Sequence, residues 1–487
     1  MEIETGRDLE TVDSMRRVTR LAALGLFALA LAGCGGASGG GTGSGGGSCT
    51  GAAGPGLFFA ASDGVSGVEL WKTDGTDAGT VCVKNINPGS GSGPLGLTVF
   101  NGALYFLASD GASGAELWKS DGTVAGTVLV KDINPGAAGS SPFGFTVFNG
   151  ALYFAANDGV SGAELWKTDG TGAGTVRVKD INPGSGNSSP FGLTVFNGAL
   201  YFAANDGASG FELWKTDGTA NGTVLVKDIN PGASGSSPSG FIVFNGATDG
   251  PNGALYFQAS DGATGLELWK TNGTDPGTVL VKKWTVTSFP GAFTVFNGAL
   301  YLQADDGVSG MELWKSDGTL AGTVLVKDIN PGAVGSFPNG FAVFNGALYF
   351  RADDGTSRIE LWKSDGTANG TVLVKDISPG ATDSNPSGFT VFNGALYFQA
   401  DDGTSGIELW KTDGTGAGTV LVKDISPGGT DSSPSGFTVF NGALYFQADD
   451  GVSGIELWKT DGTANGTVLV KDINPAGNSS PTQLTPF

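Results

Sequence analysis

The chain of 487 residues contains no histidine, only three cysteines and three methionines, and 15% charged residues. Without histidine, a Ser-His-Asp triad, a Cys-His pair and the usual zinc ligand sets are excluded. Positive charge is also scarce, since 26 Lys and Arg stand against 47 Asp and Glu. Nucleic-acid binding depends on clustered positive charge, so we expect no nucleic-acid partner.

Repetition is what the sequence has in abundance. The segment ELWK[TS][DN]GT occurs nine times, and successive tryptophans are separated by 47, 48, 48, 55, 45, 48, 48 and 48 residues. A period of this size indicates a repeat architecture. The tryptophans are Trp71, Trp118, Trp166, Trp214, Trp269, Trp314, Trp362, Trp410 and Trp458.

One repeat contains four short apolar segments separated by turn residues. Residues 145–148 and 151–154 flank Asn149-Gly150, the strongest short signal for a two-residue type I′ hairpin. Residues 164–167 and 175–179 follow, each after a glycine-rich loop. Four strands in about 48 residues are typical of one blade of a β-propeller.

The order of the strands predicts their places in such a blade. The longest loop should join the outer strand of one blade to the innermost strand of the next. This puts the FTVF segment beside the central channel and the VLVK segment at the rim. Because FTVF and ALYF are continuously apolar, we expect neighbouring blades to cover both segments on both sides.

The two ends of the repeat region predict a closed ring. The first repeat has no FTVF segment and opens with residues 56–59, which match GALYF. Residues 480–487 align with 141–148, so the C-terminal strand should complete the first blade. The predicted fold is all-β: a single β-propeller of four-stranded blades over residues 49–487, with nine blades and closure by the C-terminal strand.

The first 33 residues have the features of a secretory signal peptide. A basic segment, MRRVTR, begins at Met15, and an apolar stretch over 21–32 ends in small residues. Residues 1–14 are acidic and fit no signal peptide, which indicates an over-extended start with Met15 as the true first residue.

The end of the apolar stretch, Leu31-Ala32-Gly33-Cys34, resembles the lipobox of bacterial lipoproteins. That resemblance implies lipidation of Cys34 and a membrane anchor in the bacterial cell envelope. Ordinary secretion with an incidental cysteine is the alternative. In lipoproteins an aspartate after the cysteine often favours the inner membrane, so Gly35 favours the outer membrane or cell surface. Residues 34–48 are rich in Gly and Ser and predict a flexible tether.

The two remaining cysteines, Cys49 and Cys82, have two interpretations. In an oxidising exported compartment they could form a disulfide that ties the tether to the first repeat. Alternatively, Cys82 is a small buried apolar residue, because it stands where the next repeat has Leu129.

The repeat resembles the ELWxxDGT repeat of exported bacterial proteins, from Leu57 to the C-terminus. Its order of strands and turns is also similar, more loosely, to TolB-type propellers. The first resemblance implies an exported repeat protein and brings no catalytic residue, ligand or cofactor.

Two repeated features are candidate binding groups. The DGxSGxE loop, as in Asp402, Ser405 and Glu408, offers oxygen ligands for calcium, although Asp-Gly and Ser-Gly equally predict a turn held by the aspartate. The alternating Glu164 and Trp166 suit a sugar bound between blades. A tryptophan in a central strand is more typical of the core between blades.

The pattern breaks once, between Phe244 and Trp284, where a hairpin gains ATDGPNG and Lys-Lys-Trp replaces Lys-Asp-Ile. Recognition residues usually lie on loops of a rigid scaffold, so this is the candidate ligand region. Sequence drift in one copy is the alternative. The candidate ligand residues are Asp249, Asn252, Lys282, Lys283 and Trp284.

Taken together, these patterns predict a lipid-anchored, extracytoplasmic propeller that binds or scaffolds a protein or glycan partner. The acidic residues recur in every unit, whereas an active site is normally one asymmetric group, so we expect no enzyme, no cofactor and no metal centre. The alternative is a multivalent carbohydrate-binding propeller, with or without calcium.

Overall fold

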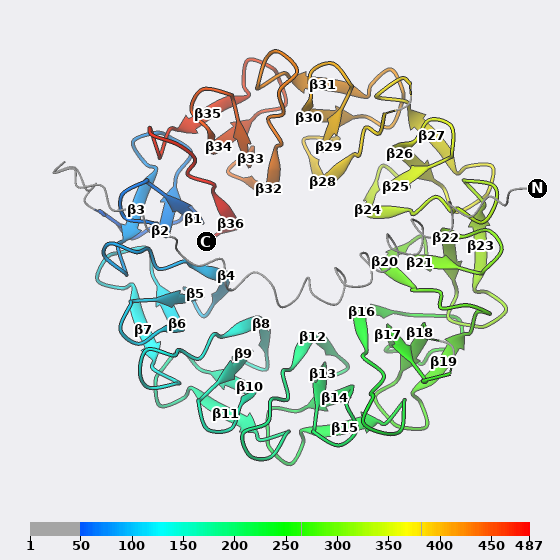
Figure 1. The fold of residues 1–487 in the computed structure, drawn as a ribbon, viewed down its shortest axis with the longest axis horizontal. Coiled ribbons are helices and arrows are strands. Elements are labelled where there is room, and N and C mark those ends of the chain that lie inside the picture. The colour runs from blue at the N-terminus through cyan, green and yellow to red at the C-terminus, as the bar shows by residue number, and fades with distance from the viewer. Residues whose placement is uncertain (1–48, 264, 381) are drawn as a thin grey trace, which may run out of the picture. The chain divides into compact units, whose positions relative to one another are not determined.

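The computed structural model describes residues 49–263, 265–380 and 382–487. The predicted signal peptide and tether, together with Cys34, lie outside the described residues. The described chain forms nine four-stranded antiparallel sheets, arranged in a ring as the blades of a β-propeller (Figure 1). Within these same ranges no helix is long and apolar enough to cross a membrane. The predicted fold class and blade number are confirmed.

Each blade contains an innermost strand and a second strand. A tight turn joins them except in blade 1, where the two strands come from opposite ends of the repeat region, and in blade 5, where residues 245–253 form a longer loop. The innermost strands of blades 1 to 9 are β36 (Thr482–Pro486), β4 (Leu95–Phe100), β8 (Phe143–Phe148), β12 (Phe191–Phe196), β16 (Ser239–Phe244), β20 (Gly291–Phe296), β24 (Asn339–Phe344), β28 (Ser387–Phe392) and β32 (Ser435–Phe440). The second strands are β1 (Leu57–Ser62), β5 (Ala103–Ser109), β9 (Ala151–Asn157), β13 (Ala199–Asn205), β17 (Ala254–Ser260), β21 (Ala299–Asp305), β25 (Ala347–Asp353), β29 (Ala395–Asp401) and β33 (Ala443–Asp449).

A third strand carries the ELWK segment, and a short outer strand carries VLVK. The third strands are β2 (Val68–Thr73), β6 (Ala115–Ser120), β10 (Ala163–Thr168), β14 (Phe211–Thr216), β18 (Leu266–Thr271), β22 (Met311–Ser316), β26 (Ile359–Ser364), β30 (Ile407–Thr412) and β34 (Ile455–Thr460). The outer strands are β3 (Val81–Lys84), β7 (Val128–Lys131), β11 (Val176–Lys179), β15 (Val224–Lys227), β19 (Val279–Lys282), β23 (Val324–Lys327), β27 (Val372–Lys375), β31 (Val420–Lys423) and β35 (Val468–Lys471).

The hairpin between the two inner strands forms as the Asn-Gly signal predicts. Asn149 and Gly150 adopt φ values of 46° and 72°, as a type I′ turn requires, and Phe148 pairs with Ala151 across it. The pairing register then shifts between Phe143 and Thr146, where a β-bulge interrupts the innermost strand.

The C-terminal strand closes the ring. β36 pairs antiparallel with β1, with Leu57 opposite Pro486, and completes the first blade. Gly56 and Phe487 exchange two backbone hydrogen bonds of 2.8 and 3.0 Å just beyond this pair. The innermost strands of successive blades contact one another around the whole ring, including β36 with β4 and with β32.

The hydrophobic core lies between the blades. At the interface of blades 2 and 3, Phe100 and Leu117 of blade 2 pack against Leu152, Phe154 and Trp166 of blade 3. The nine ELWK tryptophans are only 5–7% exposed, so they belong to this core rather than to an open surface.

The predicted burial holds for the second strand and holds only in part for the innermost one, in which Phe148 is 4% exposed. In β9, Leu152 and Phe154 are fully buried. In β8, by contrast, Val147 is 45% exposed, and the same valine of every other FTVF-type strand is 40–49% exposed. The innermost strand pairs on one side only, so less of the neighbouring blade covers its side chains.

Candidate functional site

The repeated glutamate of ELWK holds the loop that leads to the next blade. Glu164 is fully buried. Its carboxylate accepts hydrogen bonds from Ile181 N (2.8 Å), from Ser188 N (3.2 Å) and from Ser188 Oγ (2.7 Å). Burial raises the pKa of Glu164, and these hydrogen bonds oppose the rise. The glutamate is therefore used by the fold.

In most repeats two lysines fasten one blade to the next, whereas Lys72 of the first repeat donates to the carbonyl of Ala52. Lys119 of blade 2 donates to the carbonyl of Gly170 in blade 3 (2.9 Å). Lys131 donates to the carbonyl of Thr175 (2.7 Å), and its Nζ lies 5.8 Å from the Trp166 ring centroid. The equivalent lysine-to-glycine bonds are Lys167 to Gly218, Lys215 to Gly273, Lys270 to Gly318, Lys315 to Gly366, Lys363 to Gly414, Lys411 to Gly462 and Lys459 to Gly75.

The DGT turn is built from its own side chains. Asp169 Oδ1 accepts from Thr171 N (2.8 Å) and Thr171 Oγ1 (2.7 Å), and these bonds hold the pKa of Asp169 below its usual value. Asn272 makes the same two contacts in its repeat. Gly170 has φ 98°, and a Cβ there would lie 2.3 Å from Tyr105 Oη of the preceding blade, so only glycine fits.

The acidic groups of a DGxSGxE loop point to different partners. Asp402 Oδ1 accepts from Thr404 N (2.9 Å) and Ser405 N (2.7 Å), which is the turn interpretation. Glu408 is buried and accepts from Ile425 N (2.8 Å) instead. Among residues 49–263, 265–380 and 382–487, no three Cys, Asp or Glu side chains are grouped so as to hold a metal ion.

In the candidate ligand region, Asp249 is engaged inside the protein. It forms an ion pair of 2.7 Å with Lys270, and their side chains are 3% and 13% exposed. Its other oxygen accepts from Tyr256 Oη (2.7 Å) and Gly246 N (2.8 Å). Burial, together with the neighbouring Asp249, raises the pKa of Tyr256.

The other candidates of this region lie apart from one another. Trp284 is 5% exposed and meets Trp314 edge to face with ring centroids 5.7 Å apart, and Lys282 lies over Trp314 at 5.5 Å. Lys283 pairs with Asp261 at 3.1 Å. These residues lie beside the end of β17, whereas the inserted turn precedes its first residue.

Asn252, in the inserted turn, donates to Asn197 Oδ1 of the neighbouring hairpin (3.0 Å). The structure therefore divides the candidate ligand residues between two ends of blade 5. It does not gather them into one site.

Cys49 and Cys82 are joined by a disulfide. Cys82 lies on the outer strand β3 and is 6% exposed, and Thr50 N donates to its carbonyl (3.0 Å). The chain therefore enters the ring along the outer edge of blade 1.

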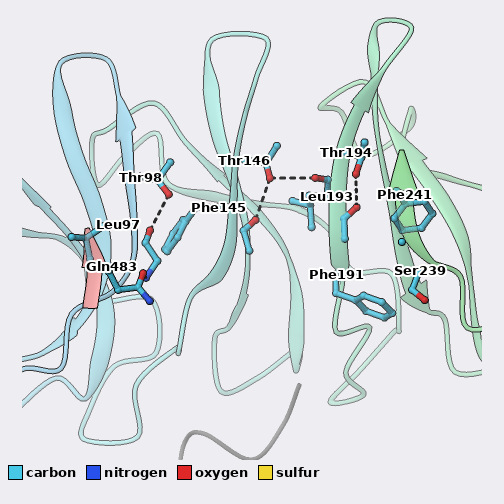
Figure 2. A pocket seen from close by; sticks show the side chains of 14 residues that line it. Leu97, Thr98, Phe145, Thr146, Phe191, Leu193, Thr194, Ser239, Phe241 and Gln483 are labelled. Carbon is cyan, nitrogen blue, oxygen red and sulfur yellow. Dashed lines mark hydrogen bonds between the residues drawn. The ribbon is translucent and has the colours of Figure 1, made fainter. Parts of the chain in front are cut away.

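A hollow lies on the surface formed by the innermost strands, which we call the inner wall. Its volume is about 570 Å³, and it runs over β4, β8, β12 and β16 (Figure 2). Figure 2 shows apolar side chains following one another along it. Its lining comprises Gly96, Leu97, Thr98, Gly144, Phe145, Thr146, Phe191, Gly192, Leu193, Thr194, Ser239, Gly240, Phe241 and Gln483. None of these described side chains is ionisable.

The inner wall is chemically uneven, because the first residue of its strands changes around the ring. In blades 2 to 4 this residue is Leu95, Phe143 or Phe191, a set that we call the apolar arc. Leu95 and Phe143 are 44% and 41% exposed. The residues opposite them on the second strand are also apolar: Leu107, Ala155 and Ala203.

In blades 5, 8 and 9 a serine takes the same place, and a glutamine of the second strand donates to it. These pairs are Gln258 with Ser239, Gln399 with Ser387 and Gln447 with Ser435, at 2.7 to 2.8 Å. Sequence reasoning missed this asymmetry. The signal was the residue after Pro in the connecting loop, which is Phe or Leu in three successive repeats and Ser in three later ones.

No family model matches the chain, and no curated protein matches it. Among solved structures, it is similar to the computationally designed protein Ika8, with a TM-score of 0.41, 15% identity and coverage of 75% of this chain and 96% of that one. It is also similar to BamB from Moraxella catarrhalis, with a TM-score of 0.37, 13% identity and coverage of 73% and 94%. A puromycin hydrolase gives a TM-score of 0.37 at 14% identity, over 78% of this chain and 60% of that enzyme. These likenesses concern the fold alone.

Proposed function

We propose that the chain is a non-enzymatic binding or scaffolding module of the bacterial cell envelope, with its ring tethered to a lipid on Cys34. The observation that carries the binding role is the hollow on the inner wall. Its lining offers aromatic, aliphatic, hydroxyl and amide groups, which suit the recognition of a ligand. General acid-base catalysis needs ionisable groups at the reacting atoms, and these lining residues supply none.

The repeated motif also supports the proposal, because its side chains already have partners within the fold. Its glutamate, tryptophan, lysine and aspartate are occupied by contacts within and between blades. The carbohydrate alternative relies on Glu164 and Trp166, which are 0% and 6% exposed, so a sugar reaches this pair only if the interface between blades opens.

The anchor is tested by expressing the full chain in bacteria fed with radiolabelled palmitate. We expect the chain to be labelled and retained in the envelope fraction, and Cys34→Ser to lose both properties. Cys49→Ser, which removes a cysteine outside the lipobox-like tetrad, should keep the label. An unlabelled wild-type chain would refute the lipid anchor.

The binding role is tested by a thermal-shift screen of the full chain against calcium, a chelator, a glycan panel and a peptide panel. A rise in melting temperature with peptides alone supports the proposal as stated. A rise with glycans or calcium supports the carbohydrate alternative. Turnover of a substrate that disappears on replacing a carboxylate pair would overturn the non-enzymatic proposal.

A further inference from the structure

Next to the apolar arc, the inner wall repeats a contact between a glycine of one blade and an aromatic ring of the next blade. Gly192 has φ 70°, and a Cβ at this position would lie 2.8 Å from the ring of Phe241 in the next blade. Gly96 stands in the same relation to Phe145. The glycine lets the neighbouring ring approach the backbone, so at each of these contacts an apolar side chain lies beside a main-chain amide.

One strand of the wall shows which group this amide accepts as a partner. In β36 the glycine is replaced by Gln483, whose side-chain Oε1 accepts a hydrogen bond from Gly96 N of β4 (3.0 Å). A glutamine side chain ends in a carboxamide, which is chemically a peptide group. The wall therefore already binds one peptide-like carbonyl at a glycine N–H.

The same amide is repeated in the neighbouring blades. Gly144, Gly192 and Gly240 have φ values of 72°, 70° and 69°, against 70° for Gly96, so their N–H groups are held in the same local geometry. All of them line the hollow beside the apolar arc. A ligand with carbonyl groups at regular steps and apolar groups between them matches this pattern.

We infer that the apolar arc and the adjoining hollow bind an extended polypeptide segment with apolar side chains at alternate positions. Its carbonyl oxygens accept hydrogen bonds from the glycine N–H groups as Gln483 does. Its side chains lie against the apolar arc and, in the hollow, against Phe145 and Leu193. This inference rests on the proposed binding function and names the chemistry of the ligand.

The first test removes the apolar arc without changing the fold. In the full chain, Leu95→Ser, Phe143→Ser and Phe191→Ser are combined, because serine already occupies this position in blades 5, 8 and 9. The probe is a short fluorescein-labelled peptide in which leucine and threonine alternate between terminal lysines. We expect about tenfold or more weaker binding by fluorescence anisotropy, since three apolar contacts are lost.

The matched control makes the same substitution outside the innermost strands and outside the lining of the hollow. Phe289 and Phe337 are 43% and 55% exposed and stand in connecting loops where other repeats have serine. Phe289→Ser combined with Phe337→Ser should bind the probe within about twofold of the wild type. Equal weakening in both variants would overturn the inference, because it would trace binding to exposed aromatic residues in general.

The second test predicts a gain. Gln483→Gly restores the residue found at this position in most blades and releases the N–H of Gly96. We expect the probe to bind about three- to tenfold more tightly, as one additional backbone hydrogen bond becomes available. Unchanged or weaker binding by a variant with wild-type circular dichroism would contradict the role given to the glycine amides.

The outcomes separate this inference from the proposed function. If the probe does not bind but a glycan or a fluorescent fatty acid does, the polypeptide inference falls and the binding role stands. If no ligand class raises the melting temperature and no probe binds, both fall. Binding of a second peptide with its leucines grouped at one end, as tightly as the alternating one, would also overturn the inference.

Discussion

At the scale of single residues, the side chains of the ELWKTDGT motif stabilise the fold. Glu164 holds the connecting loop, Trp166 lies in the core between blades, and Asp169 shapes its own turn. These tasks recur wherever the motif recurs, which explains repetition without invoking repeated ligand sites. Conspicuous residues here are therefore poor guides to binding.

The buried glutamates make stability depend on pH. Burial raises the pKa of Glu312 and Glu360 to about 7, and repulsion by Asp328 and Asp376 respectively adds to the rise. The folded protein then holds protons that the unfolded chain, with a carboxyl pKa of 4.5, releases. This stabilisation is complete below the unfolded value and is lost as pH rises through about 7.

We predict that the melting temperature falls from about pH 5 to about pH 8, and that Glu360→Gln makes the fall shallower. In the described structure Glu360 Oε1 has no hydrogen-bond partner, so replacing this oxygen by an amide nitrogen breaks no hydrogen bond. In Glu116 both oxygens accept hydrogen bonds, so Glu116→Gln should destabilise at every pH, by about 1–3 kcal/mol. Calorimetry across this pH range checks both; parallel profiles for wild type and Glu360→Gln would refute the assignment.

At the scale of the blade, stability lies in the joints between neighbours. A blade is one four-stranded sheet that cannot bury both its faces alone, and the lysine bonds and aromatic contacts are made to the next blade. Most joints repeat the same contacts. Loss of one joint should therefore weaken the ring locally without abolishing the fold.

Lys119→Met tests one joint, because methionine keeps the apolar stem and removes the charged donor to Gly170. We predict a loss of about 1–3 kcal/mol in the free energy of unfolding, measured by urea denaturation. The control is Arg177→Leu, since leucine is the usual residue at this position and the ion pairs of the arginine among the described residues, with Asp158 and Asp180, lie within its own blade. It should change stability by less than about 0.5 kcal/mol. If Arg177→Leu lowered the free energy of unfolding as much as Lys119→Met does, the contacts between blades would not be the main source of stability.

At the scale of the whole molecule, closure joins the ends of a long chain. β36 covers the edge of β1, and Phe487 packs against Phe58 with ring centroids 5.4 Å apart. An uncovered β1 edge would present unpaired backbone groups to other molecules. The ring and its resistance to association thus depend on the last few residues.

We predict that deletion of residues 482–487 lowers the melting temperature and promotes aggregation, as followed by calorimetry and light scattering. The control is a permuted chain in which residues 477–487 precede Leu57 through Asn-Gly-Ala, as in the other blades. It contains the closing strand within one hairpin and should melt close to the wild type. A deletion variant that remains monomeric and equally stable would show that closure contributes little.

Much of this architecture could be predicted from the sequence of one repeat and from the two ends of the repeat region. Asn149-Gly150 predicts the hairpin, the glycine-rich loops separate the remaining strands, and residues 480–487 reveal the missing strand of blade 1. These signals are local, because turn chemistry and apolar runs act within a few residues. The placement of Trp166 in the core followed from the same reasoning.

The inner wall and the partners of charged groups could not be read in this way. Val147 sits in an apolar run yet is 45% exposed, because exposure depends on how blades are disposed around the ring. Asp249 and Lys283 both belong to the stretch where the repeat pattern breaks, but they lie at opposite ends of blade 5. Asp249 precedes the first residue of β17, whereas Lys283 pairs with Asp261, just beyond its last residue.

By itself, then, the sequence determined the repeat, the four strands of the blade and the closure of the ring, since these follow from local turns and periodicity. Only the tertiary structure decided that Lys119 reaches Gly170, that Glu164 is buried, and that Phe191 lines a hollow on the inner wall. Those facts arise from contacts between blades, where residues distant in sequence meet, and no single repeat contains that information.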